Sequence, residues 1–371
     1  MTDNETILFD TWKHAYREEF IESLKTVINP KNIDCMVIHH MEPDHSGAIP
    51  KVLELSGNKT EVWGHPLVRD MLKSFYGISP KFRALMDGEK VTIGDKMFRF
   101  IYTPWLHWPE TMMTFILDHG VLLSGDAFGG FSIPLTIFDD DERVVSDYLV
   151  HVRKYVVNIV GHYIDRILKA ADKLREKKVS PKIIAPAHGL IFKNNPEAIL
   201  NYYIDLAKGS PEKGKIAVIY SSMYGSVEKA ISLAIDELKR NGVNPVIHKF
   251  TDMERLEISE AISDVIDAEA VIIGAATYEN DVFPYMKHLL EVLVAKVRVG
   301  KPVLVISSYG WGGVAGLKIS KKLSEAGFKV LEKVEFRGQP KREDLEKVKR
   351  GVKSLLRETK SFSSNNFKRG L

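Results

Sequence analysis

The stretch Cys35-Met36-Val37-Ile38-His39-His40-Met41-Glu42-Pro43-Asp44-His45-Ser46-Gly47 joins a short apolar run to a loop dense in metal-binding side chains. Four possible ligands, His40, Glu42, Asp44 and His45, fall within six residues. Placing so many histidines and carboxylates beside a core is costly unless a cation neutralises the carboxylates. The stretch therefore predicts a metal site where a strand turns into a helix.

Three positions further along the chain have the same setting: His107, Asp126 and His188. Each follows an apolar run and lies beside Gly or Pro, where rigid scaffolds usually carry functional side chains. Glu42 and Asp44 could be solvated loop charges, but two interleaved histidines favour metal ligands. The remaining histidines are expected to be ordinary structural residues: His14, His39, His65, His119, His151, His162, His248 and His288.

From about residue 216 onward, short β-rich runs alternate with helical stretches. Such alternation indicates a parallel sheet covered by helices on both faces. Five strands in about 150 residues fit an α/β, flavodoxin-sized, doubly wound domain. The strands are expected near 216–220, 244–249, 270–275, 302–307 and 328–336, and the helices near 226–241, 284–297, 313–325 and 340–358.

The first half is less regular and indicates an α+β or layered αββα arrangement. Its strands are expected near 34–39, 60–64, 91–94, 97–102, 112–118 and 121–124, and its helices near 14–28, 65–74 and 143–177. The polar segment 208–214, which contains Gly and Pro, is typical of a linker. We therefore expect a metal domain over 1–207, a linker over 208–214, a second domain over 215–359 and a polar tail over 360–371.

Three loops in the second half follow strand ends, the edge at which doubly wound sheets bind ligands. The first loop opens a helix, whose N–H groups can hold a phosphate. The other two bring aromatic rings beside small residues, which suits a flat flavin, although ordinary turns and caps are an alternative. The expected FMN contacts are Ser222, Met223, Tyr224, Gly225 and Ser226 in the first loop, Ala276, Thr277, Tyr278, Glu279 and Asn280 in the second, and Ser308, Tyr309, Gly310, Trp311 and Gly312 in the third.

The pattern His-x-Glu-x-Asp-His, followed by a distant His, an Asp and a last His, resembles that of the A-type flavodiiron proteins. These join a metallo-β-lactamase-like αββα sandwich to a flavodoxin-like domain. Hydrolases of that superfamily have histidine where this chain has Glu42, and a carboxylate moves the preference from zinc towards iron. The resemblance, over about residues 5–358, implies one iron on His40, Glu42 and His107, a second on Asp44, His45 and His188, and Asp126 bridging them.

Relatives of this family usually begin with some tens of further residues. Here Thr6–Asp10 is already expected to be a strand. Either the sequence begins late or the protein has an exposed sheet edge.

The resemblance implies an oxidoreductase that reduces dioxygen to water, nitric oxide to nitrous oxide, or both. Two ferrous ions and reduced FMN hold the four electrons that one O2 requires, and two NO require only two. No catalytic residue beyond the metal ligands is needed. The implied partners are an external electron donor, either rubredoxin-like or reduced F420, and a second subunit in a head-to-tail homodimer or dimer of dimers.

Two other functions stay open: a di-zinc hydrolase with an accessory flavodoxin domain, and a non-catalytic flavin electron-transfer module. Glu42 and the flavin loops argue against the first, and the carboxylate-rich ligand set against the second, since structural metal sites are usually closed and thiolate-rich. The single cysteine, Cys35, excludes a disulfide framework and a cysteine-ligated cluster. A net charge of +3 does not indicate nucleic-acid binding. Without a membrane-length apolar run or a signal-peptide pattern, we expect a cytoplasmic protein.

Overall fold

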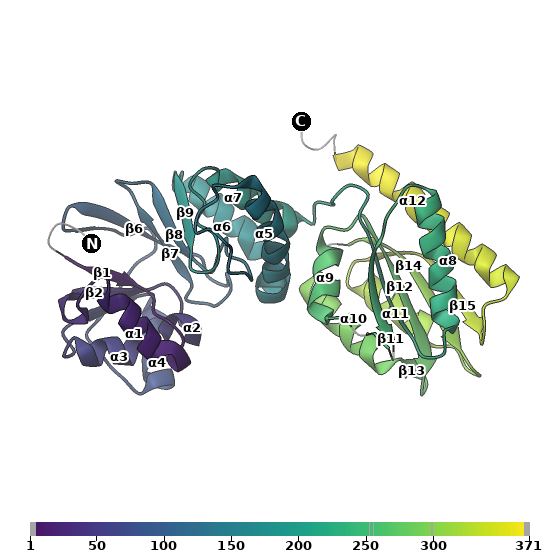
Figure 1. Ribbon diagram of the computed structural model, residues 1–371, viewed down its shortest axis with the longest axis horizontal. Helices are drawn as coiled ribbons and strands as arrows, with labels where there is room; N and C mark the ends of the chain where they lie inside the picture. The colour runs from purple at the N-terminus through teal and green to yellow at the C-terminus, as the bar shows by residue number, and fades with distance from the viewer. Residues whose placement is uncertain (1–4, 252, 255, 298–299, 367–371) are drawn as a thin grey trace. The chain divides into compact units, whose positions relative to one another are not determined.

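The computed structural model describes residues 5–251, 253–254, 256–297 and 300–366. These residues form two compact units (Figure 1). The first contains the described residues up to Tyr155 together with Asp165–Ile204, and the second contains Val156–Ile164 and the described residues from Asp205 onward. The division into domains at 208–214 stays a prediction from composition. Within the described ranges, no helix is both long and apolar enough to cross a membrane.

The first unit contains two sheets. The strands of the first sheet are all parallel and pair in chain order: β1 (Ile7–Phe9), β2 (Cys35–Ile38), β3 (Glu61–Gly64) and β4 (Phe82–Ala84). The second sheet also follows chain order and is antiparallel except for its last pair: β5 (Lys90–Ile93), β6 (Lys96–Tyr102), β7 (Met112–Ile116), β8 (Val121–Gly125) and β9 (Ile183–Pro186). The sequence did not predict β4 and β9. These strands have three and four residues, too few to show a clear alternation of apolar and polar side chains.

Strand β2 shows how the layers of this unit are built. All four of its residues are buried, and alternate side chains belong to different cores. Met36 and Ile38 pack with residues of the helices that cover the first sheet. Cys35 and Val37 pack with Phe98 and other residues of the second sheet. The expected αββα sandwich is therefore confirmed, and it places the end of β2 between the two sheets.

The helices of the first unit begin with α1 (Arg17–Lys25), α2 (Pro43–Ser46), α3 (Ile49–Leu55) and α4 (Pro66–Tyr76), which lie beside the first sheet in Figure 1. The later helices are α5 (Glu142–Tyr155), α6 (Asp165–Glu176) and α7 (Pro196–Lys208).

One helix expected over 143–177 is broken into α5 and α6 by a π-helical turn, Val156–Val160, and a 3-10 turn, Gly161–Tyr163. Contacts within the second unit hold this break. The Asn158 side-chain amide donates to the Ser259 carbonyl oxygen and to Ser263 Oγ, and Lys296 Nζ donates to the Asn158 carbonyl oxygen. These contacts are distant in sequence, so the helical pattern alone did not reveal the break.

The second unit is a parallel sheet with strand order β11-β10-β12-β14-β15, which is the flavodoxin-like order. The strands are β10 (Ile216–Ser222), β11 (Val246–Thr251), β12 (Ala270–Tyr278), β14 (Pro302–Tyr309) and β15 (Lys329–Arg337), and the short β13 (Asp281–Val282) pairs antiparallel with β12. The expected doubly wound sheet is therefore confirmed.

Helices cover both faces of this sheet (Figure 1). The helices are α8 (Ser226–Arg240), α9 (Ile258–Ile266), α10 (Pro284–Lys296), α11 (Ala315–Glu325) and α12 (Arg342–Asn366). Apolar residues of α8 and α12 share one core with the strands. The sequence reading missed α9, and α12 continues into the segment expected to be a polar tail from residue 360. The rest of that tail, 367–371, lies outside the described residues.

Candidate metal centre and flavin-binding loops

The loop after β2 carries four of the predicted ligands. Pro43 occupies the first turn of α2, where its fixed φ suits a helix start. Asp44 and His45 follow it in the same short helix. Ser46 Oγ donates to the Met41 carbonyl oxygen at 2.8 Å and lies 2.7 Å from the Tyr76 hydroxyl, which ties the loop to α4.

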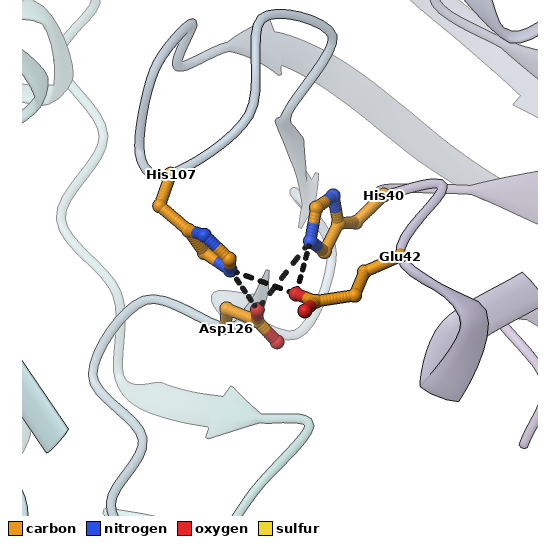
Figure 2. Close-up of side chains that lie close together, drawn as sticks. All are labelled: His40, Glu42, His107 and Asp126. Atoms are coloured by element: carbon orange, nitrogen blue, oxygen red, sulfur yellow. Dashed lines mark hydrogen bonds and ion pairs between the residues drawn. The ribbon is translucent and has the colours of Figure 1, made fainter. Parts of the chain in front are cut away.

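His40, Glu42, His107 and Asp126 form the first ligand group, in which single ligand atoms lie within 4.8 Å of one another (Figure 2). Glu42 Oε2 lies 3.1 Å from His40 Nε2 and 3.0 Å from His107 Nε2. Asp126 Oδ2 lies 3.0 Å from His107 Nε2 and 3.6 Å from His40 Nε2. Two imidazole nitrogens and two carboxylate oxygens thus converge on one small volume.

Asp44, His45 and His188 form the second ligand group. His188 Nε2 lies 3.4 Å from Asp44 Oδ2 and 3.3 Å from His45 Nε2. Asp44 Oδ1 is buried and has no hydrogen-bond partner within the described part of the chain. A bound cation would satisfy this acceptor, because carboxylate oxygens are good ligands for hard metal ions.

Asp126 connects the two groups. Its Oδ2 faces the first group, whereas its Oδ1 lies 2.6 Å from His45 Nε2 and 3.3 Å from His188 Nε2. The side chain is almost fully buried. One carboxylate therefore presents one oxygen to each group, as a ligand bridging two metal ions would.

The charges of the site are strongly coupled. Burial raises the pKa of Asp126, but hydrogen bonds from His107, His188 and His45 hold it well below the usual value. Burial lowers the pKa of His107, yet Asp126 and Glu42 raise it to about 9. Asp126 and Asp44 raise the pKa of His188, also to about 9. Without metal, these imidazoles carry protons that a cation would displace, because metal binds the neutral ring. The donor set fits two metal ions.

Two further carboxylates lie behind the ligands, and the sequence reading did not select them. Glu110 Oε1 accepts hydrogen bonds from His40 Nδ1 and from the Met41 backbone N–H. Asp10 accepts from the His39 backbone N–H and lies within 3.4 Å of His45 Nδ1. The sequence offered only weak signs that these two carboxylates belong to the site: Glu110 follows His107 by three residues, and Asp10 ends the expected first strand.

The three predicted flavin-binding segments begin in the last residues of β10, β12 and β14 and continue into the loops after them. These strands are neighbours in the sheet. Gly225, the N-cap of α8, has a φ of 79°, and a Cβ atom there would meet nothing within 4 Å. Thr277 Oγ1 accepts from the backbone N–H groups of Val314 and Ala315, which joins the second loop to the start of α11. A phosphate at the α8 N-terminus and a ring beside the other two loops fit this arrangement.

One aromatic residue in each of the first and third loops faces solvent: Tyr224 is 86% exposed and Trp311 is 94% exposed. In the second loop, Glu279 and Asn280 form the turn between β12 and β13, both with positive φ. The structure thus places all three loops at one sheet edge, with two aromatic side chains free to cover a flat ligand.

Known proteins share both halves of this architecture. Residues 1–189 match the family described as ODP family beta lactamase, and residues 218–351 match the flavodoxin family. The chain is 32% identical over 334 residues to a nitric oxide reductase from Moorella thermoacetica, covering 89% of this chain and 82% of the relative. It is 29% identical over 363 residues to a rubredoxin-oxygen oxidoreductase from Megalodesulfovibrio gigas, covering 97% and 89%. A variant of the flavo di-iron protein from Thermotoga maritima has a TM-score of 0.91 and 40% identity, covering 97% of this chain and 88% of that structure.

A metallo-β-lactamase-like domain with a double ligand group and a flavodoxin-like domain with open loops define an oxidoreductase that uses FMN and two iron ions. The chain belongs to the flavodiiron protein family. This membership favours the oxidoreductase over both the di-zinc hydrolase and the non-catalytic electron-transfer module.

Proposed function

We propose that this protein reduces dioxygen to water, nitric oxide to nitrous oxide, or both, at an iron pair supplied with electrons through FMN. The observation that carries the proposal is the shared carboxylate Asp126, which presents one oxygen to each ligand group. Relatives named nitric oxide reductase and rubredoxin-oxygen oxidoreductase support both substrates.

The proposed ligands are the seven residues predicted from the sequence. His40, Glu42 and His107 would hold one iron, Asp44, His45 and His188 the other, and Asp126 both. The ferrous pair and reduced FMN supply the electrons for either substrate when bound. The buried His40 and Asp126 keep the donor atoms in place, while Asp44 and His188 remain more than one-third exposed and leave a side open to substrate.

A cavity of about 540 Å³ borders the second ligand group. Asp44, His45 and His188 line one part of it, and apolar side chains such as Leu8 and Trp12 line another. Dioxygen and nitric oxide are small and nearly apolar, so an apolar-walled cavity suits their entry better than that of a charged substrate.

FMN is proposed to bind residues 222–226 through its phosphate and residues 276–280 and 308–312 through its ring. The external electron donor is proposed to be rubredoxin-like or reduced F420, and the relative named rubredoxin-oxygen oxidoreductase supports the first of these. A cytoplasmic location remains part of the proposal.

We also propose a head-to-tail homodimer or dimer of dimers, in which the flavin of one subunit serves the irons of the other. Between Asp126 and α5, the first unit exposes Ile133 (97%), Leu135 (96%) and Ile137. Three exposed large apolar side chains within five residues of the chain support a protein interface here. The exposed Tyr224 and Trp311 provide an apolar surface on the second unit.

The proposed activity is tested by reducing the protein under anaerobic conditions before either substrate is added. The FMN- and iron-loaded protein is fully reduced and mixed with O2 and NO in separate stopped-flow runs, with metal analysis and N2O detection alongside. Flavin reoxidation should be fast in the wild type, lost in Asp126→Ala, and retained in Asp172→Ala, a matched change at an exposed carboxylate. Zinc in place of iron would instead favour the di-zinc hydrolase. Flavin reoxidation no faster than that of free FMN would favour the non-catalytic electron-transfer module.

A further inference from the structure

Glu110 lies directly behind the proposed ligand His40 and has no exposed surface. Its Oε1 accepts from His40 Nδ1 at 3.2 Å and from the Met41 backbone N–H at 2.9 Å. With its Nδ1 proton committed to Glu110, His40 presents Nε2 to Glu42 and Asp126. The carboxylate therefore selects both the tautomer and the orientation of the ring.

Packing alone does not explain this carboxylate. Glu110 Oε2 is buried and has no hydrogen-bond partner among the residues that the structure describes. Burying a carboxylate with one oxygen unsatisfied costs stability that a Met or Leu side chain of similar size would not cost. Glu110 is therefore expected to act on its hydrogen-bonded partner, His40.

The second group contains a related but different arrangement. Asp10 Oδ2 lies 3.4 Å from His45 Nδ1 and also 3.2 Å from His39 Nδ1, so two imidazoles share it. Among the residues that the structure describes, Glu110 accepts a hydrogen bond from one ring, that of His40. Within the described ranges, neither His107 nor His188 has a carboxylate at Nδ1. Each group thus has one histidine backed by a buried carboxylate, and only the first has a dedicated one.

We infer that Glu110 is the positioning residue for the iron bound by His40, Glu42 and His107. It holds the His40 ring through an acceptor oxygen, and its negative charge makes this imidazole a stronger donor to that iron. The inference rests on the proposed ligand set. It assigns Glu110 to one of the two iron positions, so its loss should affect the two irons unequally.

Two substitutions at Glu110 distinguish the effects of its side-chain volume, its hydrogen-bond acceptor and its negative charge. Glu110→Met keeps the approximate volume but removes the acceptor, and Glu110→Gln keeps an acceptor but removes the charge. Glu89→Gln is the control, because Glu89 lies in the same unit and accepts from Arg83 and the Met86 backbone N–H, away from the ligands. Each protein is loaded with ⁵⁷Fe and examined by iron analysis, Mössbauer spectroscopy and FMN content.

Glu110→Met should retain about one iron per chain, with affinity at the affected position roughly 10- to 100-fold weaker. Glu110→Gln should keep both irons but change the Mössbauer signal of only one. Glu89→Gln should match the wild type, and FMN content should not change in any variant. Glu110→Met with both irons and wild-type signals would show a packing role and overturn the inference, as would equal loss of both irons.

If Glu110→Met fails to fold, the Glu110→Gln spectra decide: two unchanged iron signals overturn the inference. A wild-type protein that binds no iron would instead refute the proposed ligand set itself. The two failures are therefore distinguishable in the same series of samples.

Discussion

His45 Nε2 lies 2.6 Å from Asp126 Oδ1, at the point where the two ligand groups meet. The other ring nitrogen, Nδ1, faces Asp10. Burial lowers the pKa of His45, but Asp10 and Asp126 raise it to about 11. A ring held between two carboxylates has little rotational freedom, and its Nε2 points at the oxygen proposed to bridge the irons.

His45→Ala should lower the iron content from two towards about one per chain, because the second group would retain only Asp44, His188 and a share of Asp126. FMN content should not change. Iron analysis and Mössbauer spectra measure the effect, and His119→Ala, at an exposed turn, is the matched control. Full iron content in His45→Ala would mean that this histidine is not a ligand.

Gly225→Ala should weaken FMN binding. The left-handed φ of 79° costs an alanine about 1–2 kcal/mol, and relaxing it would move the N–H groups that open α8. Gly242 has the same φ and equally open surroundings in a surface turn after α8, so Gly242→Ala should cost similar stability. Flavin titration and thermal unfolding separate the effects: equal FMN affinity in the two variants would contradict a phosphate site at residues 222–226.

Ile133→Ser combined with Leu135→Ser should dissociate the proposed dimer. The homodimer contains four such side chains, two from each subunit, and burying them is worth about 6 kcal/mol, so the dimer dissociation constant should rise by roughly four orders of magnitude. Light scattering at several protein concentrations measures the mass. Val27→Ser, also at an exposed apolar residue of the first unit, is the control. An unchanged mass in the double variant would exclude this surface from the interface.

Lys301 should make stability depend on pH. Its Nζ donates to the Gly209 carbonyl oxygen at 2.7 Å, and burial lowers its pKa to about 8 from 10.5. Between these values the unfolded chain binds a proton that the folded chain does not. The free energy of unfolding should therefore rise with pH in this window, by up to about 1.4 kcal/mol per pH unit.

The comparison for Lys301 is with Lys301→Met, which lacks the titrating group. Denaturant unfolding from pH 7 to 10.5 should show the wild type gaining stability relative to this variant above pH 8. Lys321→Met, at an exposed lysine, should follow the wild type throughout. Parallel curves for the wild type and Lys301→Met would show that Lys301 is not perturbed.

Four of the predicted ligands, which the structure brings together with the other three, could be selected from the sequence because they are contiguous with a strand and a turn. His107, Asp126 and His188 were recognisable because each follows an apolar run and lies beside Gly or Pro. Asp10 and Glu110 were not, because a single acidic residue resembles any solvated charge until its partner is known. Glu110 meets Met41 across 69 residues, and Asp10 meets His45 across 35.

The fold was predictable where the alternation of strands and helices continues over many residues. The parallel strands of the second unit alternate with helices of at least nine residues, and only α9, the shortest of these helices, was missed. The break at 156–164 was also missed, because it contains no proline and its apolar pattern continues. Gly161 allows a close backbone approach within this break: a Cβ atom there would lie 2.9 Å from the Lys296 carbonyl oxygen.

Val156–Ile164 belongs to the second unit, although the chain before and after it belongs to the first. This arrangement affects how the protein could be divided into fragments. The chain passes between its two units three times, after Tyr155, after Ile164 and after Ile204. A protease that cuts only within 208–214 would divide the chain, yet Val156–Ile164, which belongs to the second unit, would remain on the fragment that carries the first unit. A fragment beginning at residue 205 would lack the turn that covers Ser259, Ser263 and Lys296. A flavodoxin exchanged into this protein by gene fusion must therefore accommodate an inserted turn as well as a linker.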